Sequence, residues 1–246
     1  MVQIRKDVIY DETRQLKTDI YYPNETTSDT KILIFWHGGG WITGDKDSLK
    51  TWGVDFANAG FMTFIPDYRL ADQAKFPAAH EDALTFTKWL LASDFTDDDD
   101  QANIMQIGAS CGGTMALYLA GLFGFKTVTW SAPVEFSKFI ETHQDTVPSH
   151  DDNEAFYKLF TLAYTGSEDP QVLQKLDVKN YDLKHLGQLK MYNSTHELTS
   201  MSSVLDFIAA LSKNDQSVIL ETIPGQHHAM GYAKQYYKKS LDFLRA

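Results

Sequence analysis

The stretch "NIMQIGASCGGTMALYLAGL", residues 103–122, decides the fold. Its first six residues are mostly apolar and predict a buried strand, whereas "TMALYLAGL" predicts a helix rich in small residues. Between them, Gly108-Ala-Ser110-Cys-Gly112 has the spacing Gly-x-Ser-x-Gly, which is typical of a tight turn from a strand into a helix. Such a turn holds a nucleophile in a strained backbone conformation, and glycine on either side leaves room for the packed strand and helix. We therefore expect Ser110 to be a nucleophile.

Cys111 offers an alternative reading of the same turn. Shifting the frame by one residue puts the thiol at the centre, flanked by Ala109 and Gly113, and a thiolate is intrinsically nucleophilic. We favour Ser110 because only that frame has glycine on both sides, and we expect the Cys111 side chain to be packed inside. A glycine-rich turn without any catalytic role is the third alternative.

Short apolar segments alternate with helical patterns along the rest of the chain. Strands are predicted at 3–11 and 15–23 (a hairpin), 31–37, 61–68, 103–108, 126–132, 188–194 and 216–225. Helices are predicted at 48–60, 77–93, 114–122, 202–213 and from about residue 229 onward. This alternation is typical of an α/β fold with a mainly parallel sheet and helices on both faces. Ligand sites in such sheets lie beyond the carboxyl ends of the strands.

The alternation stops between residues 134 and 186, where the sequence is charged and helical without a strong strand pattern. We expect one α/β domain over residues 1–246, with 134–186 inserted in it as a small helical lid. The run of aspartates at 97–100 is expected to be a solvated loop.

The amino-acid composition limits which partners and which cellular locations are expected. The 246 residues include 15 Phe, 12 Tyr and 5 Trp, which a disordered chain would lack, and the formal net charge of −11 disfavours nucleic acid as a partner. The single cysteine allows no intrachain disulfide. No segment has the apolar length of a signal peptide or a membrane span, so a soluble, cytoplasmic protein is expected. The oligomeric state stays open, and a homodimer is allowed.

A run of glycines follows the strand predicted at 31–37. In "HGGGW", residues 37–41, three glycines expose backbone N–H groups of the kind that stabilise a developing oxyanion. We assign Gly39, Gly40 and the Cys111 amide to an oxyanion hole, and expect His37 to hold the loop by hydrogen bonding. A phosphate-binding loop is disfavoured, because neither GxxxxGK nor GxGxxG fits this stretch.

A serine nucleophile needs a general base and an acid that orients the base. His227 and His228 follow the strand predicted at 216–225, and either ring could reach the same sheet edge. Glu197 is the carboxylate that directly follows the preceding strand, whereas Asp206 lies deep in the next helix. No third ligand at zinc spacing accompanies the histidine pair, so neither a metal nor an organic cofactor is expected.

The motifs "HGGGW", "DYRL", "FPAAHEDAL" and "GASCGG" occur in the order and spacing of a known family. The chain resembles the α/β-hydrolase superfamily, and within it the hormone-sensitive-lipase-like carboxylesterases and the related arylformamidases. The resemblance is strong over about residues 30–131, and beyond them it rests on the chain order serine, acid, histidine. It implies Ser110 as nucleophile, the glycine run as oxyanion hole, and, from "IPGQHHAM", His228 rather than His227 as the base. It also implies structural roles for Asp67 and Asp82.

Three positions depart from the family pattern. Ala109 and Cys111 flank the serine, where the family usually has Asp and Ala. Glu197 stands where the family usually has an Asp that is followed by a proline.

These observations predict a serine carboxylesterase that hydrolyses small or short-chain acyl esters through an acyl-enzyme. An arylformamidase-type amidase and a non-catalytic small-molecule-binding protein on the same fold are the alternatives. Aromatic side chains near the motifs are candidates for lining the substrate pocket: Trp41, Phe156, Tyr157 and Phe160.

Overall fold

The computed structural model describes residues 2–27, 29–96 and 103–246. The strands in these ranges are β1 (Gln3–Asp11), β2 (Leu16–Tyr22), β3 (Ile32–Trp36), β4 (Met62–Pro66), β5 (Ile104–Ala109), β6 (Lys126–Trp130), β7 (Leu189–Ser194) and β8 (Val218–Ile223). The α-helices are α1 (Lys50–Asn58), α2 (Ala78–Leu91), α3 (Cys111–Phe123), α4 (Ser137–Thr142), α5 (Asn153–Thr165), α6 (Pro170–Leu176), α7 (Met201–Ser212) and α8 (Met230–Arg245). Two 3₁₀ helices, η1 (Lys46–Leu49) and η3 (Val178–Asn180), complete the described elements.

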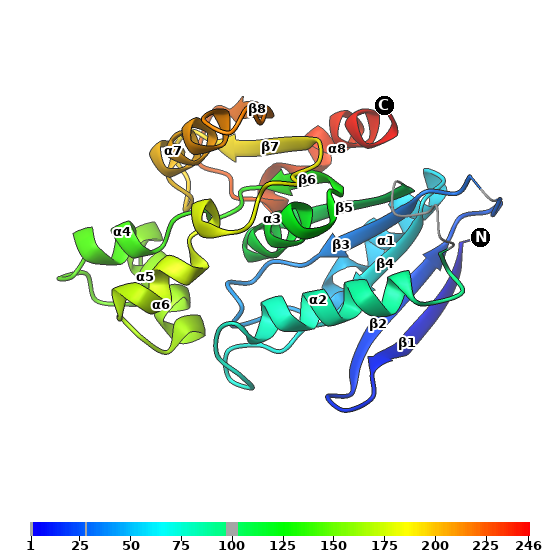
Figure 1. Ribbon diagram of the computed structural model, residues 1–246, viewed down its shortest axis with the longest axis horizontal. Helices are drawn as coiled ribbons and strands as arrows, with labels where there is room; N and C mark the ends of the chain where they lie inside the picture. Colours follow the sequence, from blue (N-terminus) through cyan, green and yellow to red (C-terminus); the bar gives the residue numbers. More distant parts are fainter. Residues whose placement is uncertain (1, 28, 97–102) are drawn as a thin grey trace.

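One sheet contains all eight strands of the described ranges, in the order β1-β2-β4-β3-β5-β6-β7-β8 (Figure 1). The hairpin β1–β2 is antiparallel, and β2 also runs antiparallel to β4, with Ile20 opposite Phe64. From β4 onward each pair is parallel, so that Ile34 of β3 lies opposite both Phe64 and Gln106. The structure therefore confirms the predicted α/β class with its mainly parallel sheet.

Both faces of the sheet are covered, and β3 shows how its sequence achieves this. Successive side chains of a strand point to opposite faces. Ile34 and Trp36 of β3 therefore pack with α2 and α3, whereas Leu33 and Phe35 pack with α1 and α8 on the other face. All four side chains are fully buried, which explains why the strand reads as a continuous apolar run.

The helices begin and end close to the predicted positions, with one informative difference. The predicted helix at 114–122 begins three residues earlier, at Cys111, directly after Ser110. Gly112 and Gly113 therefore lie inside the first turn of α3, because close packing at this point excludes larger residues.

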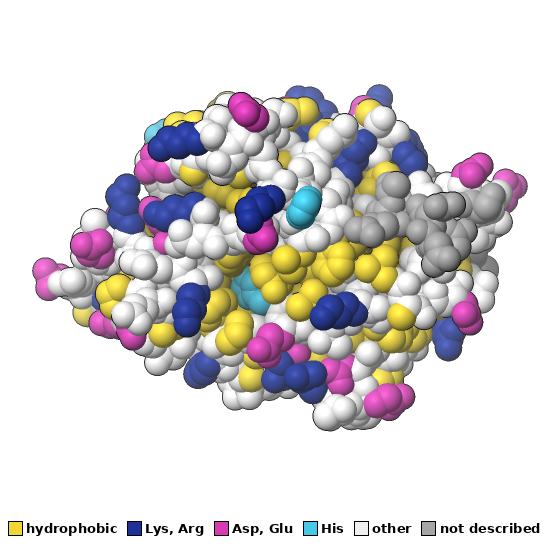
Figure 2. All heavy atoms as spheres, viewed as in Figure 1, with side chains coloured by type: hydrophobic (Ala, Val, Ile, Leu, Met, Phe, Trp, Pro, Cys, Tyr) yellow, Lys and Arg dark blue, Asp and Glu magenta, His cyan; other side chains and the backbone are white. Residues whose placement is uncertain are grey.

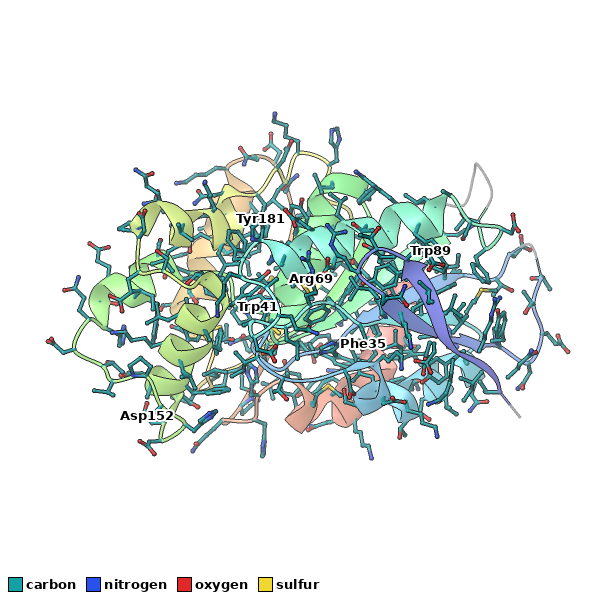
Figure 3. All side chains as sticks on the ribbon, turned by 90° about the horizontal axis from the view of Figure 1, so that it is seen from below. Phe35, Trp41, Arg69, Trp89, Asp152 and Tyr181 are labelled. Carbon is teal, nitrogen blue, oxygen red and sulfur yellow. The ribbon has the colours of Figure 1, made fainter. Side chains whose placement is uncertain are left out.

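Residues 134–186 form an insertion between β6 and β7 that contains α4, α5, α6 and η3, and we call it the β6–β7 insertion. It projects beyond one end of the sheet in Figure 1. Figure 3 shows Trp41 between this insertion and the sheet, with Asp152 at the outer end of the insertion. The carboxyl ends of the parallel strands face the insertion, so the loops after β3, β5, β7 and β8 meet beside it.

The surface mixes charges of both signs. Figure 2 shows acidic and basic side chains interspersed over one face, on either side of a central band of hydrophobic side chains. Among the helices formed by the described residues, none is long and apolar enough to cross a membrane. The aspartate run at 97–100 lies outside the described residues.

Candidate active site

Ser110 occupies the turn between β5 and α3. Its backbone has φ +52° and ψ −128°, in a region that costs a non-glycine residue about 1–3 kcal/mol. Two hydrogen bonds hold the turn: the Ser110 N–H donates to the Trp130 carbonyl at 2.8 Å, and the Gly113 N–H donates to the Ser110 carbonyl at 2.7 Å. The serine is thereby raised at the carboxyl edge of the sheet.

Steric crowding explains why glycine occupies the positions two residues before and after Ser110. A Cβ on Gly108 would lie 2.3 Å from the Gly112 carbonyl oxygen. A Cβ on Gly112 would lie 2.4 Å from the carbonyl oxygens of both Trp36 and His37. Both contacts are to backbone, which cannot move aside, so the Gly-x-Ser-x-Gly spacing follows from the packing of β3, β5 and α3.

Cys111 is fully buried, and its sulfur accepts a hydrogen bond from the Trp41 N–H at 3.3 Å. Burial raises the pKa of the thiol to about 11, so it is not ionised at neutral pH. The reactive form of a cysteine is the thiolate, and this geometry therefore favours Ser110 as the nucleophile. The Cys111 amide lies in the first turn of α3, where the helix dipole is positive.

His228 is the histidine that the structure places beside Ser110. Its Nε2 lies 2.9 Å from the Ser110 Oγ, and its Nδ1 forms a short hydrogen bond with Oε2 of Glu197. Since a carboxylate only accepts hydrogen bonds, Nδ1 carries the proton, and Nε2 is left to accept the serine proton. His227 is exposed, with its side chain close to Gly231.

Glu197 is held so that one oxygen remains for the histidine. Its side chain is fully buried, and Oε1 accepts hydrogen bonds from the Ser131 Oγ and from the Ser194 N–H, both at 2.7 Å. Oε2 faces His228. The structure thus brings Ser110, His228 and Glu197 into one hydrogen-bonded chain.

The reasoning from sequence missed Ser131. This buried residue directly follows β6 and has φ +54°. Besides donating to Glu197, its Oγ accepts the Ala229 N–H at 2.9 Å and lies 2.7 Å from the Tyr232 hydroxyl. It therefore links the acid to the backbone residue that follows His228. Its position directly after a parallel strand was the signal that could have found it.

The glycine run after β3 lies against the serine turn. A Cβ on Gly38 would lie 3.1 Å from the Ser110 Cβ, and Gly38, Gly39 and Gly40 line the same cavity as Ser110. Gly39 and Gly40 have φ +115° and +60°, and a Cβ on Gly39 would lie 2.0 Å from the Thr43 carbonyl oxygen. Only glycine fits this loop conformation.

His37 supports this loop, as its sequence position predicts. Its ring stacks on Tyr68 at 4.1 Å between centroids, and the Tyr68 hydroxyl donates to the His37 carbonyl at 2.8 Å. Burial lowers the pKa of His37 to about 4, so the ring is neutral at neutral pH.

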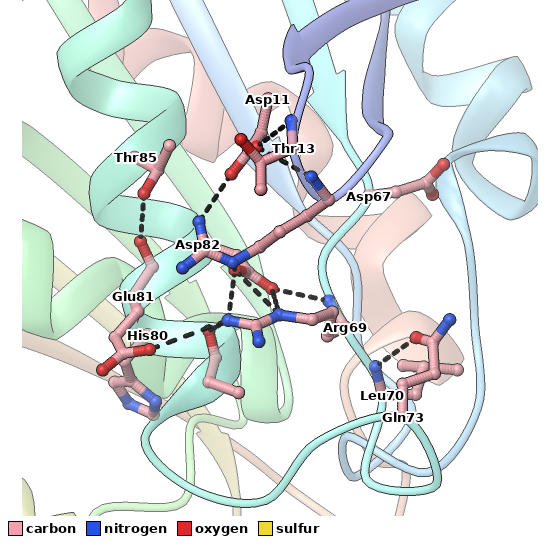
Figure 4. Close-up of polar contacts among 12 residues, drawn as sticks. Asp11, Thr13, Asp67, Arg69, Leu70, Gln73, His80, Glu81, Asp82 and Thr85 are labelled. Carbon is pink, nitrogen blue, oxygen red and sulfur yellow. Dashed lines mark hydrogen bonds and ion pairs between the residues drawn. The ribbon is translucent and has the colours of Figure 1, made fainter.

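The two aspartates of the family motifs hold neighbouring elements together. Asp82 is fully buried on α2 and accepts hydrogen bonds from the Arg69 guanidinium at 2.7 and 2.8 Å (Figure 4). Asp67, after β4, accepts the Lys46 N–H at 2.7 Å at the start of η1. Burial raises the pKa of Asp67 to about 6. Neither carboxylate reaches Ser110.

A cavity of about 390 Å³ opens at the serine. Besides the glycine run, its walls are Ser48, Leu49, Ala109, Ser110, Phe156, Phe160, Leu198, His228, Ala229 and Met230. Its lining is mainly apolar away from the serine and the histidine. Phe156 and Phe160 thus line it as expected from the sequence, whereas Leu49, Leu198 and Met230 carried no signal that singled them out.

Trp41 and Tyr157 are corrections to the predicted pocket. Trp41 is fully buried and stacks on Tyr164 at 4.3 Å, with its ring turned into the core rather than into the cavity (Figure 3). Tyr157 is buried one helical position away from Phe156, and its hydroxyl donates to the Glu135 carbonyl at 2.7 Å. Trp41 thus contacts Tyr164, and Tyr157 contacts Glu135, so neither residue is among the cavity walls beside the serine.

In residues 2–27, 29–96 and 103–246, no three His, Cys, Asp or Glu side chains cluster in a way that could hold a metal ion.

The sequence pattern of the BD-FAE family matches residues 18–148, which is more than half of the chain. The chain belongs to the BD-FAE family. The matched segment includes the glycine run and Ser110, whereas Glu197 and His228 lie beyond it.

Individual relatives of this BD-FAE family member carry esterase names. It is 37% identical over 89 residues to ethyl acetate hydrolase from Pseudomonas putida, a match that covers 36% of this chain and 28% of the relative. It is 28% identical over 196 residues to versiconal hemiacetal acetate esterase from Dothistroma septosporum, covering 71% of this chain and 60% of the relative. Each match therefore spans less than two thirds of the relative's length.

The fold is shared with solved esterase structures. An esterase from the bacterial hormone-sensitive lipase family superimposes on this BD-FAE family member with a TM-score of 0.73 and 21% sequence identity. The superposition covers 99% of this chain and 84% of the other. This likeness identifies the fold as that of the α/β-hydrolases, in agreement with the resemblance seen in the sequence.

Proposed function

We propose that this protein is a serine carboxylesterase that hydrolyses small or short-chain acyl esters through an acyl-enzyme. The observation that carries the proposal is the hydrogen-bonded chain from the Ser110 Oγ through His228 to Glu197. It opens into a cavity whose other walls are mainly apolar.

The first half of the reaction acylates the enzyme. The Ser110 Oγ attacks the ester carbonyl carbon while its proton passes to Nε2 of His228. Glu197 keeps the imidazole in the tautomer that accepts this proton and stabilises the imidazolium that forms. His228 then donates the proton to the alcohol oxygen as the bond between that oxygen and the carbonyl carbon breaks, which leaves Ser110 acylated.

The carbonyl oxygen becomes negative in the tetrahedral intermediate. We assign its stabilisation to the amides of Gly39, Gly40 and Cys111, supported by their place around Ser110 and by the dipole of α3. The strained φ of Ser110 orients the Oγ before substrate arrives, so less ordering is needed during the reaction.

The second half releases the acid. A water molecule loses a proton to Nε2 of His228 and attacks the acyl carbon, and the returning proton regenerates the Ser110 hydroxyl. No step requires a metal ion or an organic cofactor.

The cavity supports a small ester as substrate. Leu49, Phe156, Phe160 and Met230 surround the serine with apolar side chains that suit a short acyl chain. The names of the two relatives, an ethyl acetate hydrolase and an acetate esterase, agree with this size.

A fluorophosphonate probe and a substrate panel test the proposal together. We expect the probe to label Ser110, and the wild type to hydrolyse p-nitrophenyl acetate and butyrate faster than N-formylkynurenine. Ser110→Ala should lower kcat by about 10⁴-fold or more, whereas Ser212→Ala, on the exposed side of α7, should leave turnover unchanged.

Other outcomes decide between the alternatives. Faster turnover of N-formylkynurenine would assign an arylformamidase-type amidase. An unlabelled protein that turns over neither class of substrate would be a binding protein on this fold.

A further inference from the structure

A second cavity of about 510 Å³ lies close to the catalytic one. It is formed between the β6–β7 insertion and the segment that carries Glu197, and its walls include Glu135, Lys138, His143, Glu154, Ser200 and Ser202. Polar groups therefore make up about half of the surface of this cavity, whereas the walls around Ser110 are mainly apolar. We call the two the polar cavity and the serine cavity.

Leu198 lines both cavities, and no other residue in the described parts of the chain does so. Its side chain is half-buried and packs against the core beside the serine cavity. Because it contacts both spaces, this side chain lies in the wall between them.

The residues on either side of Leu198 are held by hydrogen bonds. On one side, Glu197 is bonded to Ser131, to the Ser194 N–H and to His228. On the other side, Thr199 is buried, and its hydroxyl donates to the Ser131 carbonyl at 3.2 Å. The position of the wall is therefore fixed, and its thickness depends on the side chain at 198.

Helix α5 contributes to both cavities and forms the rest of the wall. Phe156 and Phe160 face the serine cavity, whereas Asn153 and Tyr157 face the polar one. Tyr157 and Phe160 are buried and their rings lie 4.9 Å apart, so this part of the wall is well packed. Leu198 is less buried than Tyr157 and Phe160, and it is the wall residue that contacts both cavities.

We propose that Leu198 is a specificity-determining residue, and this proposal rests on the proposed esterase function. The Leu198 side chain closes one end of the serine cavity and keeps longer acyl groups out of the polar cavity. Esters with a short acyl chain fit in front of Leu198. Removal of its side chain joins the two spaces, so that a longer acyl chain with a polar end can pass through.

The test compares acyl chain lengths in the wild type and in Leu198→Ala. For p-nitrophenyl octanoate we expect kcat/KM to rise by about tenfold in Leu198→Ala, mainly through a lower KM, as the steric exclusion of several methylenes is relieved. For p-nitrophenyl acetate the change in kcat/KM should be much smaller than for the octanoate, because a two-carbon acyl group gains little from the added length of the cavity. An 8-hydroxyoctanoyl ester should gain more than the octanoyl ester, since its hydroxyl reaches the polar cavity.

Two further variants support the comparison. Leu198→Phe keeps the wall closed and thickens it, so it should lower kcat/KM for p-nitrophenyl butyrate. Leu205→Ala makes the same deletion on the exposed side of α7, outside both cavities, and should leave the chain-length profile as in the wild type.

Three results would overturn the proposal. An unchanged chain-length profile in both Leu198 variants would show that this side chain is not the boundary. An equal loss of turnover for acetate and octanoate would show that Leu198 only supports Glu197. If the wild type itself is neither labelled by the fluorophosphonate nor active on any ester, the proposed function fails and this inference fails with it.

Discussion

His228 and His80 each have both ring nitrogens in hydrogen bonds, yet the surroundings of the two rings differ. His228 lies between Ser110 and Glu197 at the edge of the serine cavity, with 26% of its side chain exposed. His80, on α2, is buried between the hydroxyls of Tyr164 and Tyr181, at 2.9 and 3.1 Å. Tyr164 and Tyr181 both belong to the β6–β7 insertion, so His80 joins α2 to this insertion (Tyr181 is labelled in Figure 3).

The partners decide what each ring can do. The Tyr181 hydroxyl donates to the Leu176 carbonyl at 3.0 Å, so Nε2 of His80 donates to Tyr181 and Nδ1 accepts from Tyr164. Both partners of His80 are neutral, and burial lowers its pKa to about 3. His228 has a carboxylate behind it and a cavity in front, so a proton can be accepted there. The comparison shows that a carboxylate and access to substrate, rather than two hydrogen bonds, distinguish a base from a structural histidine.

Replacing the carboxylate is expected to have the largest effect. Glu197→Gln preserves the shape but removes the charge that fixes the tautomer of His228, and kcat for p-nitrophenyl acetate should fall by about 10³–10⁴-fold. Circular dichroism should show an unchanged fold. A loss of less than tenfold would mean that His228 does not depend on this acid.

Removing the support of the carboxylate should have a smaller effect. In Ser131→Ala, Glu197 loses one charge-assisted hydrogen bond and the Ala229 N–H loses its acceptor. A bond to a charged group contributes about 1.5–3 kcal/mol, which corresponds to a decrease of about 10- to 100-fold in kcat with little change in KM. Ser131→Thr, which keeps the hydroxyl, should recover part of the activity; no recovery would assign Ser131 to packing alone.

The structural histidine should affect stability rather than turnover. His80→Phe leaves the Tyr164 hydroxyl without its acceptor and should lower the free energy of unfolding by about 1–3 kcal/mol, while kcat stays within about threefold. Denaturant unfolding at pH 7 measures the first quantity, and His80→Gln, which can restore an acceptor, is the matched variant. A drop in kcat as large as that of Glu197→Gln would remove the distinction between the two histidines.

The role of His80 in stability also predicts how the free energy of unfolding changes with pH. The pKa of His80 is lower in the folded protein than its ordinary value of about 6.5, so the unfolded chain binds the proton more readily. The stabilisation from neutral His80 is complete above about pH 6.5 and is lost as the pH falls toward 3, by up to about 1.4 kcal/mol per pH unit. His80→Phe should therefore show a shallower loss of stability between pH 6.5 and pH 4 than the wild type.

The smallest effect is expected at Cys111. Its amide remains in Cys111→Ala, and the buried thiol is protonated at neutral pH, so kcat should stay within about threefold of the wild-type value. Iodoacetamide should leave the folded wild type active. If Cys111→Ala were inactive and Ser110→Ala active, the nucleophile would be the cysteine.

Much of the fold and of the candidate site could be predicted from the sequence, because the signals were local. The continuous apolar run of β3 and the Gly-x-Ser-x-Gly turn depend on residues that are neighbours in the chain, and the structure has both the buried strand and the turn. The chain order of Ser110, Glu197 and His228 could be predicted because each lies within a few residues of the end of a strand, and parallel strands end at one edge.

The rest depended on contacts between distant segments. Trp41 follows the glycine run, and its apolar ring could face the cavity or the core. Its stacking on Tyr164, which lies on the β6–β7 insertion, directs it into the core. Ser131 could be noted from its place directly after β6, but its role could not, because that role needs Glu197 and Ala229, which lie 66 and 98 residues away along the chain.

The sequence by itself determined the alternation of strands and helices, the strained serine turn and the residues that follow each strand, because these rest on sterics and periodicity within a few residues. Only the tertiary structure decided which aromatic rings line the cavity, how Ser131 supports the acid, and that Leu198 lies between two cavities. Those outcomes depend on how separate segments pack against one another, and short-range patterns in a chain carry little information about that.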